Sequence, residues 1–201
     1  TDGSYVTFDT EGNMTKKEKD IRYYRTKKRM NDAMIELLKI KNFNQITVKD
    51  ICEKATISRS GFYLHYMDKY DLVEKYQLEL MKQINRIIDE ETKRNASMEE
   101  IMIKILYFFK KEGLLLGLLL SNKGSVEIQN QVKKALQQNG LKNVLSYINI
   151  KFETEIEKHY LVIFFSNAAF GLLQEWINNG QKESPEELVR ILNKIVPYKF
   201  I

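Results

Sequence analysis

The sequence predicts an all-α protein in which a small N-terminal helical domain is joined by a long helix to a larger helical domain. Only two prolines and nine glycines occur in 201 residues, and Leu, Ile, Lys and Glu are abundant, which favours helices. Apolar residues recur at helical spacing along most of the chain. Residues 46–72 also contain two short helical patterns separated by a turn, and helices this short must pack against neighbours to form.

The first helix is predicted over residues 22–41, and Asn42 ends it. Its apolar stripe and the apolar residues that follow should close a small three-helix core. The residues predicted for this core are Met30, Ala33, Met34, Leu37, Leu38, Phe43, Ile46, Val48, Ile51, Cys52, Ala55 and Phe62.

The second and third helices have recognisable start signals. The hydroxyl of Thr47 can cap the second helix, and Asp50 three residues later makes a near capping box. Thr56 and Ile57 form the turn, and Ser58 caps a third helix of about two turns. This is the helix-turn-helix arrangement, in which the second helix of the motif enters the DNA major groove.

The third helix is rich in side chains that can contact DNA. Arg59 can pair with guanine in bidentate fashion or hold a phosphate, and the hydroxyls of Ser60 and Tyr63 suit base edges or phosphates. His65 and Lys69 follow at its end and at the start of the next helix. For Tyr63 and His65, a plain packing or surface role is the alternative.

The segment resembles the DNA-binding domain of the tetracycline-repressor-like (TetR/AcrR) family of bacterial transcription regulators. The resemblance implies that Tyr63, His65 and Lys69 anchor the DNA backbone. The positions that it places nearest the bases are Arg59, Ser60 and Gly61. The matching residues are Arg25, Thr26, Lys27, Lys28, Ala33, Leu37, Phe43, Thr47, Val48, Ile51, Ser58, Arg59, Phe62, Tyr63, His65, Tyr66, Lys69 and Leu72.

Three positions depart from the family pattern, and one glycine needs a reason. The family usually has Gly at the positions of Asn42 and Thr56, and Phe at the position of Tyr66. Gly61 in the middle of a helix costs about 1 kcal/mol relative to Ala. Close approach of the backbone to DNA or tight packing on the preceding helix would account for it.

Charge is concentrated at the N-terminal end. The chain carries a formal net charge of +5, and residues 16–29 hold eight Lys/Arg against two acidic residues. A basic segment directly before a helix-turn-helix is where DNA phosphates would lie, although a solvated helix face is the alternative. Further candidates for DNA contact are Lys27, Thr47, Lys49 and Ser58.

The remaining helices should build the second domain. They are predicted over residues 68–92, 98–111, 113–120, 125–150 with a kink or break at Asn139 and Gly140, 154–179, and from Pro185 to a stop at Pro197. Three units follow: residues 1–15 as a native flexible arm or an artificial leader before Met14, residues 16–68 as the helix-turn-helix domain, and residues 69–201 as an effector-binding and dimerisation domain.

The predicted helix over residues 154–179 is apolar nearly all round, so it should be buried on more than one side. Its second face predicts a homodimer, because a helix-turn-helix usually reads two half-sites. The alternative is the central helix of a monomeric core. The residues expected at the dimer interface are Phe165, Ala169, Leu172, Leu173, Trp176, Leu188, Ile191, Leu192 and Ile195.

The resemblance also implies a small-molecule effector whose binding in the second domain releases DNA. The sequence offers aromatic lining candidates, although such residues also build ordinary cores. These candidates are Tyr76, Tyr107, Phe108, Phe109 and Phe170.

Catalytic and cofactor signals are missing from the sequence. His65 and His159 lack acid or base partners at diagnostic spacing, and we expect no metal site, no cofactor and no enzyme activity. The longest apolar run, residues 113–120, is too short to span a bilayer, so no membrane association is expected. The single cysteine, Cys52, excludes an internal disulfide and favours the reducing cytoplasm.

The sequence therefore predicts a cytoplasmic, ligand-responsive transcription regulator, most simply a repressor that binds a palindromic double-stranded operator as a homodimer. The alternative is a coactivator with a repurposed helix-turn-helix that acts through protein–protein contacts. The operator, the effector and the sign of regulation do not follow from the residues.

Overall fold

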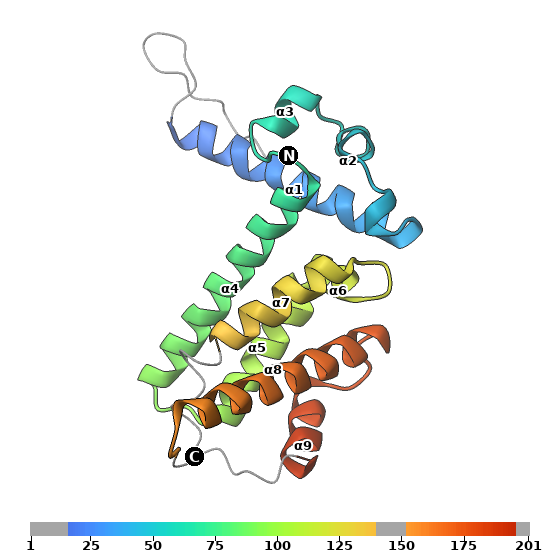
Figure 1. Ribbon diagram of the computed structural model, residues 1–201. Helices are drawn as coiled ribbons and strands as arrows, with labels where there is room; N and C mark the ends of the chain where they lie inside the picture. The colour runs from blue at the N-terminus through green and yellow to red at the C-terminus, as the bar shows by residue number, and fades with distance from the viewer. Residues whose placement is uncertain (1–15, 140–151, 196–201) are drawn as a thin grey trace.

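The computed structural model describes residues 16–139 and 152–195, and in that part of the chain every regular element is a helix (Figure 1). The all-α prediction is confirmed. The helices are α1 (Lys16–Ile40), the 3-10 helix η1 (Phe43–Gln45), α2 (Val48–Ala55), α3 (Arg59–Tyr63), α4 (Lys69–Lys93), α5 (Met98–Glu112), α6 (Leu114–Leu120), α7 (Val126–Asn139), α8 (Glu155–Asn178) and α9 (Pro185–Ile195). The predicted arm at residues 1–15, the continuation from Gly140 to residue 150 and the stop at Pro197 lie outside the described residues.

The head, residues 16–68, contains α1, α2 and α3 at one end of the molecule, and α4 runs from it along the body formed by α5–α9 (Figure 1). Helix α1 begins at Lys16, so the predicted start at residue 22 was too late. The basic run from residue 16 contains no Pro or Gly, and lysine and arginine are good helix formers, so nothing in it stops the helix.

The helix starts follow the sequence signals. Thr47 and Asp50 form a reciprocal capping box at α2, in which the Asp50 N–H donates to the Thr47 hydroxyl at 3.1 Å and the Thr47 N–H donates to the Asp50 carboxylate at 2.8 Å. The carboxylate of Asp50 accepts from the Thr47 backbone N–H, the Lys41 ammonium and the Thr47 hydroxyl, and these bonds lower the pKa of Asp50 to about 2. Thr56 ends α2 with φ at 54°, a left-handed conformation that glycine adopts more readily.

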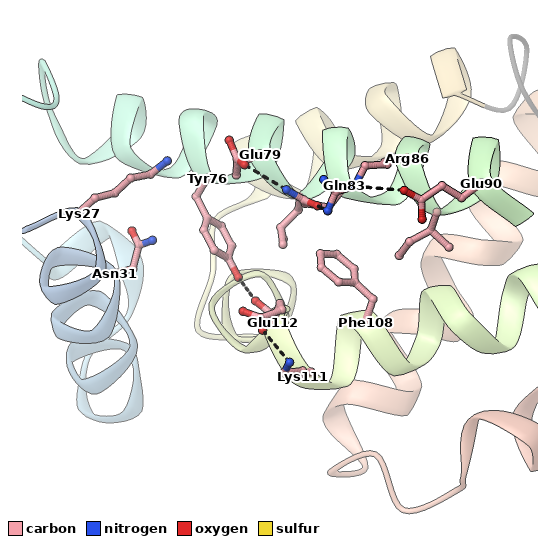
Figure 2. Close-up of a pocket in the computed structure, with 12 residues that line it drawn as sticks. Lys27, Asn31, Tyr76, Glu79, Gln83, Arg86, Glu90, Phe108, Lys111 and Glu112 are labelled. Atoms are coloured by element: carbon pink, nitrogen blue, oxygen red, sulfur yellow. Dashed lines mark hydrogen bonds and ion pairs between the residues drawn. The ribbon is translucent and has the colours of Figure 1, made fainter. Parts of the chain in front are cut away.

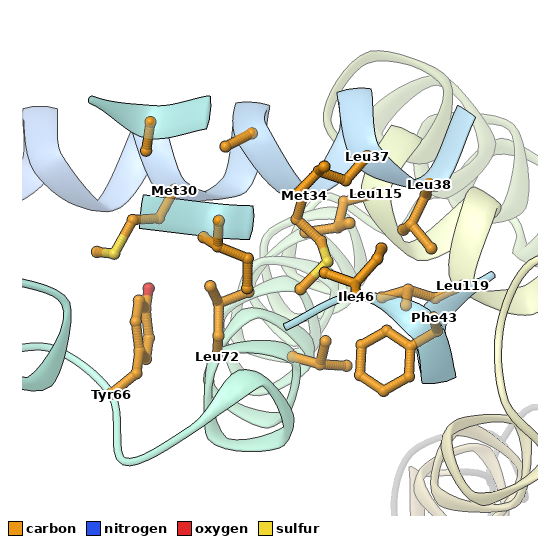
Figure 3. Close-up of a cluster of buried hydrophobic side chains, with 14 of the residues drawn as sticks. Met30, Met34, Leu37, Leu38, Phe43, Ile46, Tyr66, Leu72, Leu115 and Leu119 are labelled. Atoms are coloured by element: carbon orange, nitrogen blue, oxygen red, sulfur yellow. The ribbon is translucent and has the colours of Figure 1, made fainter. Parts of the chain in front are cut away.

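One hydrophobic core fills the head and continues into the body. The head's buried residues, such as Met34 and Phe43, pack in the same cluster as Leu115 and Leu119 of α6 (Figure 3). The Phe43 N–H also donates to the carbonyl oxygen of Lys123, in the loop after α6, at 2.8 Å. The head is therefore packed against α6 as well as being joined to α4.

Helix α6 contributes leucines to two hydrophobic cores. Leu115 and Leu119 face the head, whereas Leu116 and Leu120 join the body core. Helix α6 therefore contributes to the core of the head as well as to the core of the body. The residues that make up the body core are Leu80, Phe109, Leu116, Leu120, Val132, Phe170, Trp176 and Leu188.

Candidate nucleic-acid interface and effector groove

The recognition helix α3 is short, and two features fix its position. Its N-terminus is capped by Ser58, whose hydroxyl accepts the Gly61 N–H at 3.0 Å. Phe62 on its inner face is completely buried in the head core. The outer face is left to solvent, with the Tyr63 side chain 57% exposed and Arg59 and Ser60 also exposed. Cation, hydroxyl and phenol thus lie on one exposed surface.

Gly61 lies where α3 meets its own cap. A β-carbon at this position would stand 3.2 Å from the Ser58 hydroxyl oxygen, close enough to disturb the capping bond. Local packing against Ser58 therefore accounts for this glycine without DNA. Thr47 and Lys49, at the start of α2, are exposed, and Lys49 forms only a long exposed ion pair with Glu53 at 3.8 Å.

His65 is half-buried against α1. Its ring stacks on Tyr23 with centroids 4.3 Å apart and planes at 27°, and its Nδ1 atom is buried without a hydrogen-bond partner. Burial lowers the pKa of His65, and the charges of Lys27 and Lys75 lower it further. The packing role that the sequence left open is therefore a substantial part of what His65 does, and α1 buttresses the end of α3 through Tyr23.

Lys69 does not stand free for a phosphate. Its ammonium donates to the carbonyl oxygens of Phe43 at 2.8 Å, Asn44 at 3.2 Å and Ile46 at 2.8 Å. An ammonium has three N–H donors, and these three carbonyls use all of them. Burial lowers the pKa of Lys69. The structure therefore favours a structural role for Lys69, because the carbonyl oxygens of Phe43, Asn44 and Ile46 lie within reach of its ammonium. The backbone-anchoring role that the resemblance implies stays a prediction.

Lys27 is also placed differently from the expectation. It is half-buried and extends from α1 into a groove between α1, α4 and α5 (Figure 2). Its ammonium therefore belongs to the junction of head and body. The exposed guanidinium groups of Arg25 and Arg29 remain as cations of α1, and Arg29 donates to the Thr56 carbonyl oxygen at 2.8 Å in the turn before α3.

This groove, the junction groove, has a volume of about 560 Å³. Leu80 and Phe108 are apolar residues of its lining, and the half-buried Tyr76 donates a hydrogen bond to the Glu112 carbonyl oxygen at 2.6 Å (Figure 2). Burial raises the pKa of Tyr76 to about 12, so the phenol is neutral. The residues that line the groove are Lys27, Asn31, Tyr76, Glu79, Leu80, Gln83, Arg86, Ile87, Glu90, Phe108, Lys111 and Glu112.

Only two of the five aromatic candidates for the effector site line this groove. Tyr76 and Phe108 do, but Phe109 and Phe170 are buried in the body core. Tyr107 is half exposed on the opposite side of α5 and donates to the Glu186 carboxylate of α9 at 2.9 Å. Consecutive residues on a helix point in different directions, so residues 107–109 could not share one cavity. The sequence also missed the polar groups of the groove, such as Asn31, whose side-chain oxygen is buried and unpaired.

Helix α8 presents a long apolar stripe to solvent. Ile156, Tyr160 and Phe164 recur every four residues and are each more than 60% exposed. Helix α9 adds the exposed Ile191 and Ile195. These five residues are called the α8–α9 stripe below. Several exposed apolar side chains along one helix face can mark an interaction site.

Part of the predicted dimer interface lies inside the protomer. The Trp176 side chain is only 2% exposed, and its indole N–H donates to the Glu183 carbonyl oxygen at 3.1 Å. Leu188 is buried in the same core, and Leu173 packs against it. Trp176 and Leu188 are therefore core residues of the protomer, because one face of an all-apolar helix must cover its own domain and the sequence does not reveal which face. Leu173 is only partly buried and stays a predicted interface residue, as Leu172 does.

Helix α8 is long and apolar enough by length and composition to cross a membrane, so the expectation from residues 113–120 overlooked a candidate span. This is weak evidence for a membrane span, because the core helix of a soluble protein can be equally long and apolar. Here α8 carries the buried polar Ser166 and contributes Val162, Phe170 and Trp176 to the interior of the protein.

Comparison with known proteins covers both halves of the chain. The family model for the N-terminal domain of "Bacterial regulatory proteins, tetR family" matches residues 32–76, and the model for a "Transcriptional regulator C-terminal region" of TetR type matches residues 96–198, just over half of the chain. The uncharacterised HTH-type transcriptional regulator YxbF of Bacillus subtilis is 22% identical over 175 residues, which are 85% of this chain but only 44% of that protein.

Solved structures agree on the fold. A TetR transcriptional regulator from Streptococcus agalactiae has a TM-score of 0.64 at 22% identity, covering 90% of this chain and 99% of the other. The dihydroxyacetone kinase operon activator DhaS has a TM-score of 0.57 at 17% identity, covering 85% and 93% of the two chains. At these identities the likeness shows the fold alone. With both domain models matched, the chain belongs to the tetR family of bacterial transcriptional regulators, which are DNA-binding proteins and not enzymes.

Proposed function

We propose that the protein is a cytoplasmic repressor that binds a palindromic operator as a homodimer and leaves it when a small-molecule effector binds. The observation that carries this proposal is the outer face of α3. Arg59, Ser60 and Tyr63 are exposed together on a helix held by the Ser58 cap and the buried Phe62. Their chemistry suits base edges and phosphates in a major groove.

The surroundings of α3 support a phosphate-binding rim. Thr47 and Lys49 are exposed at the start of α2, where a hydroxyl and an ammonium can both contact phosphate. Arg25 is exposed on α1, and Arg29 lies beside the turn that precedes α3. A positive rim around a reading helix fits nucleic acid better than an apolar protein partner, so it favours DNA over the coactivator alternative.

The α8–α9 stripe supports the homodimer. A two-fold axis through this surface would bury the same apolar residues of both copies and present two α3 helices to one duplex. Ala169 and Leu172 of α8 and Leu192 of α9 are at least partly accessible, so they can join it, and so can the half-buried Phe165.

The junction groove supports effector control because its wall belongs to both parts of the protein. Lys27 and Asn31 come from the head, whereas Gln83 and Phe108 come from α4 and α5. A molecule that binds all four holds α1 at a set distance from α4. It changes DNA affinity if the operator-bound head requires a different distance.

Selection of bound sequences from random duplex DNA, followed by measurement of the mass of the complex, tests the proposal. We expect a short palindrome bound by two copies of the chain. Failure to enrich any duplex, or a complex that contains one chain on an asymmetric sequence, would refute it.

A further inference from the structure

The proposed DNA-facing surface contains a large apolar side chain that can neither bind phosphate nor form a hydrogen bond. Leu64 directly follows α3 and is 82% exposed, more than any other large apolar residue identified as exposed in the described part of the chain. Its N–H donates to the Ser60 carbonyl oxygen at 3.1 Å, so the helical turn continues through it. A single exposed leucine is ordinary on a protein surface, but this one lies on the same short helical turn as Ser60 and Tyr63.

The geometry places Leu64 on the reading face. Ser60, Tyr63 and Leu64 are spaced i, i+3 and i+4, so they share one side of the helical turn. Phe62 and Tyr66, on the other side, are 0% and 2% exposed and close the head core. The side of α3 that is turned away from the core therefore ends in an isobutyl group.

We propose that Leu64 reads thymine by packing against its C5-methyl group, so that each half-site contains a thymine specified by apolar contact. Among the groups that base pairs present in the major groove, this methyl is the apolar one, and the others donate or accept hydrogen bonds. Leucine can make neither bond, so opposite any other base edge it would remove water from a polar group without replacing it. The inference rests on the proposed operator binding and adds one base preference to it.

Replacing thymine by deoxyuridine tests this contact, because uracil keeps every hydrogen-bonding group of thymine and lacks only the methyl. In a palindrome recovered by selection, each symmetric pair of thymines is replaced in turn, and affinity is measured for the wild type and for Leu64→Ala. Burial of one methyl corresponds to about a fourfold change in affinity, so two half-sites give about 15-fold. The wild type should lose this factor at one symmetric pair, and Leu64→Ala should lose nothing there.

Leu78→Ala is the matched control, since Leu78 is also an exposed leucine but lies on α4. It should keep the full uracil penalty. Truncation of so exposed a side chain removes almost no packing, so Leu64→Ala should fold normally, which its thermal melt will check. A palindrome without a uracil penalty, or a penalty that persists in Leu64→Ala, would overturn the inference and leave the proposed function intact. Absence of any palindrome would instead defeat the proposed function itself.

Discussion

Lys69→Met separates a structural lysine from a DNA-binding one. Methionine keeps an unbranched stem of similar length but cannot donate to the carbonyls of Phe43, Asn44 and Ile46. The bonds to Phe43 and Ile46 are partly buried, and bonds from a charged donor contribute about 1.5–3 kcal/mol each. Allowing for rehydration of the freed carbonyls, we expect a loss of about 2–3 kcal/mol in the free energy of unfolding, which is about 5–10 °C in Tm for a chain of this size.

The same variant should leave the electrostatics of DNA binding unchanged. A phosphate contact by Lys69 in both subunits would add about 1.8 to the slope of log affinity against log salt concentration. Because its three donors are already used inside the head, we expect that slope to stay constant at a temperature where the variant is folded. Fluorescence anisotropy over a salt series, with thermal melts of the same samples, gives both numbers.

Lys49→Met is the matched control and should show the opposite behaviour. Lys49 is exposed at the start of α2, and its only recorded ion pair there is long and solvated, so its loss should hardly change Tm. If Lys49 holds phosphate, its loss should reduce the salt slope by about 1.8. A Lys69→Met protein with unchanged Tm and a shallower salt slope would refute the structural role assigned to Lys69.

Three further outcomes are expected. Phe164→Glu should yield monomers at micromolar concentration in light scattering, because a two-fold axis would duplicate the carboxylate in an apolar interface. Ile40→Glu on the head is the control and should stay dimeric. A dimeric Phe164→Glu protein would show that the interface lies elsewhere. Arg59→Ala should reduce discrimination at one position of each half-site by about 1–3 kcal/mol in competition binding, and uniform weakening on all sequences would make Arg59 a phosphate ligand. Folding lowers the pKa of His65, so the contribution of neutral His65 to stability should be complete above pH 6.5, the ordinary pKa of histidine, and should decrease as the pH falls below that value. His65→Asn should flatten this part of a profile of Tm against pH. Parallel profiles for the two proteins would contradict the prediction.

The local features of the fold could be predicted from the sequence because their signals are short-range. The cap of Thr47 with Asp50, the cap of Ser58 and the buried Phe62 each depend on residues a few positions apart. Thr56 stands where the resembling family usually has glycine, and the structure places it in the left-handed conformation at the end of α2.

The interactions that the sequence could not reveal connect distant segments. Lysine is a residue type that often binds phosphate, but the hydrogen-bond partners of Lys69 lie more than twenty residues earlier in the chain. Trp176 and Phe164 are equally apolar in sequence, yet one fills the body core and the other is 64% exposed. An all-apolar helix contains no periodic signal for its rotation, so the choice between core and interface is made by packing alone.

The two cores and the junction groove meet near the start of α6, so the proposed effector control of the head would act through this point. Tyr76, in the groove, holds the Glu112 carbonyl at the end of α5, and Gly113 follows directly. A β-carbon on Gly113 would lie 2.5 Å from the Phe109 carbonyl oxygen, so the passage from α5 into α6 has no spare room. Leu115 begins the packing against the head two residues later. We therefore expect a molecule that shifts Tyr76 to shift the start of α6, and because α6 is packed into both cores, the head should move with it.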